Sequence, residues 1–220
     1  MHHTYTNTSL VPQVVYDRNG NAYVVAPGAT WTENFITPEA GLFGYIVGAP
    51  AAAVANRFVT DVAMKVGAYD VANASPADGL ARNVTVTHSV QGGTADTLGT
   101  ITVTGTDIEG NVISEEITPV SGDVAAGAKA FKTVTGIVGA GWAIDAGGTP
   151  AADHITVGFG NLVGLPVFIS EEAKVIAVAL GTALINAPTV AHGATVSQCT
   201  VDASSGTYNA TKKLWVMLNQ

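Results

Sequence analysis

Two short segments carry oxygen-bearing side chains at the alternating positions that calcium loops use. Residues 17–21 (Asp-Arg-Asn-Gly-Asn) and residues 107–111 (Asp-Ile-Glu-Gly-Asn) share the pattern Asp-x-x-Gly-Asn. Both lack the downstream bidentate glutamate that completes an EF-hand loop. Asp, Asn and Gly are also the residues that tight turns favour. We therefore interpret both segments as hairpin tips, keep calcium binding as the alternative, and predict no metal site.

The histidines and the single cysteine lack the spacing of a metal centre. No His-x-x-x-His or Cys/His pattern occurs among His2, His3, His88, His154 and His192. His88 lies on the apolar face of a strand-like alternation, so we expect a buried, hydrogen-bonded core histidine. Cys199 lies in residues 196–201, which read as a strand, so we expect a buried and unreactive thiol.

Groups that could support catalysis do not converge in the sequence. The carboxylate pairs at residues 115–116 and 171–172 are chain neighbours and cannot face each other across a sugar. Asp153 and His154 are also adjacent, and adjacent strand residues point to opposite faces. No Gly-x-Ser-x-Gly elbow occurs, and the glycines of residues 136–141 and 158–164 lack the order and the βαβ context of a nucleotide-binding loop. We predict that the chain is not an enzyme, with no catalytic residue, cofactor or small-molecule substrate, and that these glycines mark close strand packing.

Aromatic and large apolar residues suggest contacts with other molecules. Trp31, Trp142 and Trp215 could contribute to a carbohydrate platform, although isolated aromatics in β-rich chains more often pack in cores or interfaces. The N-terminal region holds apolar bulk that would form an exposed patch in an isolated monomer, and a strand added to a neighbour's sheet edge would bury it. The residues that we predict to contact a partner are Tyr5, Leu10, Val11, Tyr16, Tyr23, Trp31 and Phe35. Packing of this region within its own chain is the alternative.

The chain is acidic and sparsely charged. Nine Lys and Arg stand against 17 Asp and Glu, which gives a net charge of −8, and charged residues make up only 12% of the 220 residues. The scattered basic residues argue against a nucleic-acid partner, which needs clustered positive charge. A weakly charged surface is poorly protected against association and suits a protein packed against neighbours.

Targeting features are few. The longest apolar stretch, residues 175–185, is too short to cross a bilayer, so we expect no membrane partner. The polar first residues lack the pattern of a secretory signal. One cysteine allows no internal disulfide, which is consistent with folding in a reducing cytoplasm.

Strand patterns dominate the chain. Residues 84–90, 101–104 and 112–117 alternate apolar and polar side chains with period two, and 25 glycines and nine prolines punctuate such runs. We predict hairpins between residues 14–16 and 22–25, and between residues 101–106 and 112–117. Only residues 50–59 and 170–173 could form short helices, the second with Ser170 as its cap.

These patterns predict an all-β protein. We expect a β-sandwich of jelly-roll or Greek-key type over residues 41–220, with residues 1–40 as an N-terminal arm and hairpin. No Gly/Ser-rich or Pro-rich linker divides the chain.

Residues 80–170 resemble a β-sandwich module of tailed-bacteriophage virion proteins, of the head-decoration type. The segments that carry the resemblance are residues 81–87, 98–107, 110–111, 115–117, 129–137, 155–161 and 164–166, with residues 206–208 near the C-terminus. The resemblance implies a virion component. Together with the sparsely charged surface it predicts a decoration (cement) protein on the capsid surface, with the major capsid protein and other copies of itself, as a homotrimer, as its partners. The alternatives are a head-fibre base or tail protein, and a carbohydrate-binding module of a host-facing appendage.

Overall fold

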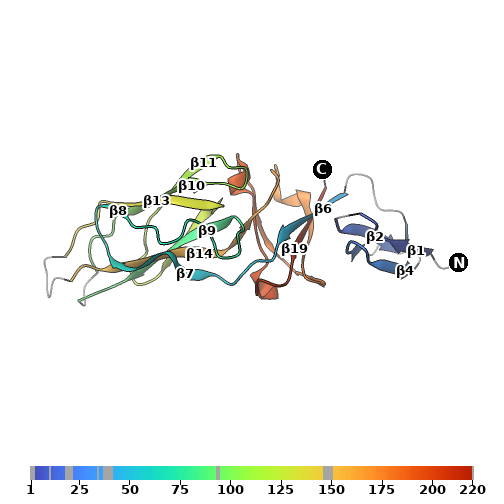
Figure 1. Ribbon diagram of the computed structural model, residues 1–220, viewed down its shortest axis with the longest axis horizontal. Coiled ribbons are helices and arrows are strands. Elements are labelled where there is room, and N and C mark those ends of the chain that lie inside the picture. Colours follow the sequence, from blue (N-terminus) through green and yellow to red (C-terminus); the bar gives the residue numbers. More distant parts are fainter. Residues whose placement is uncertain are drawn as a thin grey trace.

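The computed structural model describes residues 3–9, 11–17, 22–33, 35–36, 42–92, 95–145 and 151–219. The regular elements in these ranges are strands, apart from three short 3₁₀ turns at Glu172–Lys174, Val196–Gln198 and Ser204–Gly206. The all-β prediction is therefore confirmed. The molecule is elongated, with a β-sandwich at one end and the N-terminal strands at the other (Figure 1).

Period-two alternation produces the strands, as β10 (Thr100–Thr106) illustrates. Ile101 and Val103 are fully buried, whereas the intervening threonines are half-exposed. Successive side chains of a strand point to opposite faces, and β-branched residues fit that pleat. Two hairpins predicted from sequence are confirmed: β10 pairs with β11 (Val112–Ile117), and β2 (Gln13–Asp17) pairs with β3 (Ala22–Val25).

The sandwich consists of eight antiparallel strands in two sheets. The four-stranded sandwich sheet has the order β11-β10-β13-β8, with β13 at Thr133–Ala140 and β8 at Gly67–Tyr69. The facing strands of the six-stranded sheet are β12 (Val124–Phe131), β9 (Arg82–Ser89), β14 (His154–Gly164) and β7 (Val54–Ala63). The pairs are nested along the chain, since β10 pairs with β11, β9 with β12, β8 with β13 and β7 with β14. One apolar cluster, which includes Phe58, Val84, Ile101 and Phe159, fills the space between the two sheets.

The last strand of the sandwich continues into a second apolar cluster. Near its end, β14 stops pairing with β7 and pairs instead with β18 (Thr200–Asp202), which in turn pairs with β17 (Thr189–Ala191). Opposite them lies the C-terminal sheet, with the order β16-β15-β19-β6. Its bounds are β16 Ala183–Leu184, β15 Val175–Leu180, β19 Leu214–Asn219 and β6 Leu42–Gly48. Leu165, Val178, Cys199 and Val216 belong to this second cluster.

The N-terminal segment, residues 3–36, forms two small sheets. β1 (His3–Thr6) pairs with β4 (Thr30–Glu33), and β2 lies between β3 and β5 (Phe35–Ile36). Asn7 joins them because its buried side-chain amide donates to the carbonyls of Val11 and Val25, both at 2.7 Å. These hydrogen bonds link the end of β1 to the residues before β2 and to the end of β3.

Three local predictions are wrong. Residues 50–59 do not form a helix, because Val54–Ala63 pairs with β14 and buries Phe58 and Val59, so tertiary packing overrides the helix propensity of the alanines. At residues 170–173 the helix is a single 3₁₀ turn that starts after Glu171, and Ser170 does not cap it. Residues 196–201 begin as a 3₁₀ turn, and only Thr200–Asp202 is a strand.

Candidate functional site

One buried carboxylate ties together the connections at the end of the sandwich that lies far from the N-terminal segment. We call this end, with the described parts of residues 64–66, 90–99, 118–123 and 141–153, the loop end. The carboxylate of Asp153 accepts hydrogen bonds from the backbone N–H groups of Gln91 (2.6 Å) and Asp96 (2.8 Å). Its carbonyl oxygen accepts the N–H of Met64 at 2.6 Å. Asp153 therefore fixes two connections that are far apart in sequence.

His88 adds the third connection to this network. Its Nε2 lies 3.0 Å from Oδ2 of Asp153, and its Nδ1 accepts the N–H of Gly122 at 2.9 Å. Because Nδ1 is an acceptor, the proton is on Nε2 and is donated to Asp153. The expectation of a buried, hydrogen-bonded histidine is confirmed, since both side chains are fully inaccessible. Both ring nitrogens are therefore engaged in hydrogen bonds that join β9 to two connections of the loop end.

Asp96 completes the network from the other side. Its carboxylate accepts the N–H groups of Asp153 (2.8 Å) and Asp145 (2.7 Å). Burial by itself would raise the pKa of Asp96, but these N–H donors outweigh it and hold the pKa below its usual value. The folded structure therefore stabilises the charged form of the Asp96 carboxylate. All four connections of the loop end are held by one set of buried polar groups.

A second buried polar site lies where the two apolar clusters meet. The guanidinium of Arg82 is fully buried, forms an ion pair with Asp78, and donates to the carbonyl oxygens of Gly160 and Ala51. It lies 4.9 Å from the ring centroid of Phe159 and 5.4 Å from that of Tyr208. Burial lowers the pKa of Arg82 and Asp78 raises it, and the guanidinium stays charged because its ordinary pKa is so high. Each ring belongs to a different cluster, so Arg82 joins the sandwich to the C-terminal part.

The calcium alternative is not favoured at residues 107–111. Oδ1 of Asp107 accepts the N–H groups of Glu109 and Asn111, both at 2.9 Å, and Oδ2 accepts the side-chain amide of Asn111. Gly110 takes a positive φ of 88°, as the turn interpretation requires. The first tip, residues 18–21, lies outside the described residues. Within the described ranges no group of three or more His, Cys, Asp and Glu is placed to share a metal ion.

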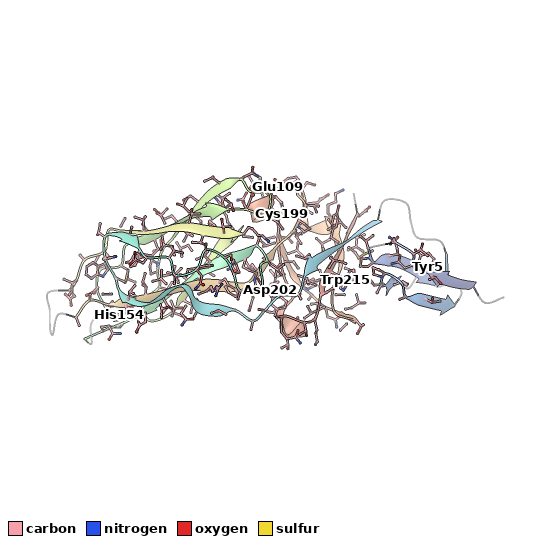
Figure 2. All side chains as sticks on the ribbon, viewed as in Figure 1. Tyr5, Glu109, His154, Cys199, Asp202 and Trp215 are labelled. Atoms are coloured by element: carbon pink, nitrogen blue, oxygen red, sulfur yellow. The ribbon has the colours of Figure 1, made fainter. Side chains whose placement is uncertain are left out.

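The other candidate residues have structural roles. Cys199 is fully buried, with Sγ 3.6 Å from the carbonyl oxygen of Ile169, as expected for an inert thiol (Figure 2 shows its central position). Glu115 accepts the N–H groups of Ala128 and Lys129 at the bulge of β12, whereas Glu116 is exposed. A Cβ at Gly158 would lie 1.8 Å from the carbonyl oxygen of Val54, which confirms close strand packing there.

The remaining histidines and acidic residues also lie apart. His154 pairs at 3.0 Å with the exposed Asp61, and His192 and the pair at residues 171–172 are exposed. His2 lies outside the described residues, and only the backbone of His3 is described. None of these side chains joins the buried network of the loop end.

The predicted partner contacts lie in the N-terminal segment, which rests against the C-terminal sheet of its own chain. Tyr5 and Val11 are half-buried, Leu10 lies outside the described residues, and only the backbone is described for Tyr16, Tyr23, Trp31 and Phe35. The segment approaches β6 so closely that a Cβ at Gly44 would lie 2.5 Å from the carbonyl oxygen of Pro12. Figure 2 shows Tyr5 beyond Trp215 at this end of the molecule. Contact with a partner stays a prediction.

The tryptophans do not form one platform. Trp142 packs against the sandwich cluster, whereas Trp215 lies on β19 of the C-terminal sheet. The side chain of Trp31 is not described.

No sequence pattern pointed to Asp153 or Arg82 as centres of buried networks, because their partners lie up to 65 and 78 residues away along the chain.

No protein family, curated protein or solved structure matches this chain. In the described part of the chain, no helix is long and apolar enough to cross a membrane. The functional interpretation therefore depends on the residues and their geometry.

Proposed function

We propose that this chain is a non-enzymatic structural protein of a bacteriophage particle, and specifically a capsid decoration protein. In this role it binds the outer surface of the major capsid protein lattice and stabilises the head. The resemblance of residues 80–170 to phage decoration proteins supports the first half of the proposal. The buried polar networks support the absence of catalysis, because their charged groups are committed to holding loops and clusters in place.

We further propose that the sandwich is a jelly roll. When β7 to β14 are numbered 1 to 8 along the chain, the two sheets have the orders 1-8-3-6 and 2-7-4-5. This nested order results when one long antiparallel ribbon of paired strands is wrapped into two layers. Jelly rolls occur in viral capsid and lectin domains. A fold does not by itself define a function, so this order supports the proposal only together with the surface.

The outward face of the four-stranded sandwich sheet is the observation that carries the decoration role. Along β10 this face presents Thr100, Thr102, Thr104 and Thr106, all half-exposed. In register with them lie Ser114 and Glu116 of β11 and Val138 of β13, the last 43% exposed. Among these residues only Glu116 carries a charge, and the others present hydroxyl and apolar groups. Such a face can pack against another protein with little charge to desolvate.

Binding to the capsid tests the proposal directly. Purified protein, mixed with capsids of the encoding phage that lack it, should co-sediment with them and raise the temperature at which they open. Because few charges are involved, salt should weaken this binding only slightly. Capsids that bind none of the protein, or that resist heat equally without it, would contradict the decoration role.

The number of copies per particle separates the proposal from its alternatives. A decoration protein should approach the number of capsid subunits, as measured by quantitative mass spectrometry of purified virions. A copy number as low as that of a vertex or tail component would favour a fibre base or tail protein. Binding to a glycan array that depends on Trp31 or Trp142 would favour the carbohydrate-binding module.

A further inference from the structure

Glu115 is a charged residue at a position of β11 that faces the interior of the sandwich. In the register of β10 and β11 it lies opposite Val103, which is fully buried. Ile113 and Ile117 lie on the same side of the strand, since side chains two residues apart share a face. Among the described strands, β11 is the outer strand of the four-stranded sandwich sheet. From this edge the inward side chain of Glu115 reaches the facing sheet.

The carboxylate of Glu115 contacts the outer edge of that facing sheet. Its Oε1 accepts the N–H of Ala128 at 2.7 Å, and its Oε2 accepts the N–H of Lys129 at 3.2 Å. Both N–H groups belong to β12, the outer described strand of the six-stranded sheet, where its register against β9 shifts. A Cβ at Gly127 would collide with this carboxylate, so the glycine leaves room for it. Glu115 thus binds two N–H groups that lie outside the regular pairing of β9 and β12.

The side chain of Lys129 makes the reciprocal contact. Its Nζ donates to the carbonyl oxygen of Ser114 on β11 at 2.8 Å. Asn83 of β9 fixes the same bulge from within the sheet, because its side-chain amide donates to the carbonyl oxygen of Gly127 at 3.0 Å. The outer strands of the two sheets are therefore joined by Glu115 in one direction and by Lys129 in the other. We call these two side chains, with the contacts above, the edge latch.

The opposite side of the sandwich is covered by the chain itself. There the outer strand is β7, whose carbonyl oxygen at Phe58 accepts the backbone N–H of Ala72 at 2.8 Å. The next carbonyl oxygen, that of Arg57, accepts the side-chain amide of Asn73 at 2.9 Å. Uncovered strand edges promote association with other chains. Because only 12% of the residues are charged, the surface offers little other protection, and both sides of the sandwich are covered.

We propose that the edge latch is an autoinhibitory contact that prevents the edges of β11 and β12 from pairing with an extended strand of a second copy of this chain. Inward-pointing charges and lysines on outer strands are means by which β-proteins avoid such pairing. Without the carboxylate, the N–H groups of Ala128 and Lys129 are open to the carbonyl oxygens of another strand. Strand addition satisfies such groups with little demand on sequence. This role does not depend on the proposed capsid function.

Sedimentation velocity of the purified full chain over a range of concentrations tests the edge latch. A buffer with about 0.5 M NaCl screens the repulsion between copies that each carry a net charge of −8. Glu115→Ala should associate more tightly than the wild type by roughly tenfold or more, the effect of one or two new backbone hydrogen bonds. Glu116→Ala is the matched control, because it removes the same charge from the next residue, whose carboxylate accepts from Thr100 on the outward face. That variant should sediment like the wild type.

Amide hydrogen exchange, followed residue by residue by NMR, shows whether the edge opens in a folded protein. In Glu115→Ala the N–H groups of Ala128 and Lys129 should exchange faster than in the wild type, while the paired residues of β9 and β14 keep their protection. If Glu115→Ala loses the protection of β9 and β14, Glu115→Gln replaces it in both measurements. Glutamine keeps the size of the side chain and one accepting oxygen, so it opens the edge in part.

A second substitution shows whether the association uses this edge. Ala128 is exposed, and a lysine on an outer strand disfavours strand addition, so adding Ala128→Lys to Glu115→Ala should restore the behaviour of the wild type. Equal association of Glu115→Ala and Glu116→Ala, unchanged exchange at Ala128 and Lys129, or association that Ala128→Lys leaves intact would overturn the proposal. None of these outcomes would bear on binding to the capsid.

Discussion

Nε2 of His88 lies 3.0 Å from Oδ2 of Asp153, and neither side chain is accessible to solvent. The two residues are 65 positions apart, on β9 and just before β14. Their contact, with the N–H groups that both residues accept, joins the described connections of the loop end. The stability of this end should therefore depend on a few polar residues.

Replacing the carboxylate of Asp153 should destabilise the protein strongly. Asp153→Asn turns one of two accepting oxygens into a donor that faces N–H groups, so we expect a loss of about 2–4 kcal/mol in the free energy of unfolding. Urea denaturation measures this loss. Asp61→Asn, which removes the exposed partner of His154, is the control and should change stability by less than about 0.5 kcal/mol. Equal effects of the two substitutions would contradict the network.

Removing the guanidinium of Arg82 at the junction of the two clusters should lower the free energy of unfolding, and a second substitution at Asp78 should restore part of it. Arg82→Met leaves the carboxylate of Asp78 buried without its cation, and we expect a loss of about 3–5 kcal/mol. Adding Asp78→Asn should recover part of this loss, because no buried charge then remains. A double-mutant cycle by denaturant unfolding should give a coupling of at least about 1 kcal/mol, whereas simple additivity would contradict the ion pair.

Alanine substitutions at two glycines in strands of the sandwich should have opposite effects on the stability of the protein. Gly158→Ala places a Cβ 1.8 Å from the carbonyl oxygen of Val54, so strands β14 and β7 must separate, at a cost of about 2–3 kcal/mol or more. Gly136→Ala, on β13, meets nothing closer than Cβ of Thr104 at 4.0 Å. It should be neutral or stabilising by up to about 1 kcal/mol, because alanine restricts the unfolded chain. Thermal unfolding of both variants compares the two sites.

The protein should lose stability at alkaline pH through Tyr208. Burial raises the pKa of this phenol to about 12, from an ordinary value of 10.0. A raised pKa means that the fold favours the protonated form, so its contribution is complete below pH 10.0 and is lost as the pH rises toward about 12. The loss should be on the order of 2 kcal/mol. Unfolding free energies across this range should fall more steeply for the wild type than for Tyr208→Phe, and parallel curves would contradict the assignment.

The sequence alone was sufficient for the features that depend on neighbouring residues. Alternating Thr and Val predicted β10, and Asp107 with Gly110 predicted the turn that follows, because side-chain direction and turn geometry are set within a few residues. The burial of His88 also followed from its place in an apolar alternation. The low content of charged residues follows from the composition of the sequence alone.

Only the tertiary structure decided which distant groups meet. The alanine-rich residues before Phe58 favour a helix locally, yet they extend because β14 offers a pairing edge. Asp153 finds His88, and Arg82 finds Gly160 and Tyr208, through strand order, which no local pattern encodes. The contact of Pro12 with Gly44 has the same origin, since it exists only where the N-terminal segment and the C-terminal sheet come together in space.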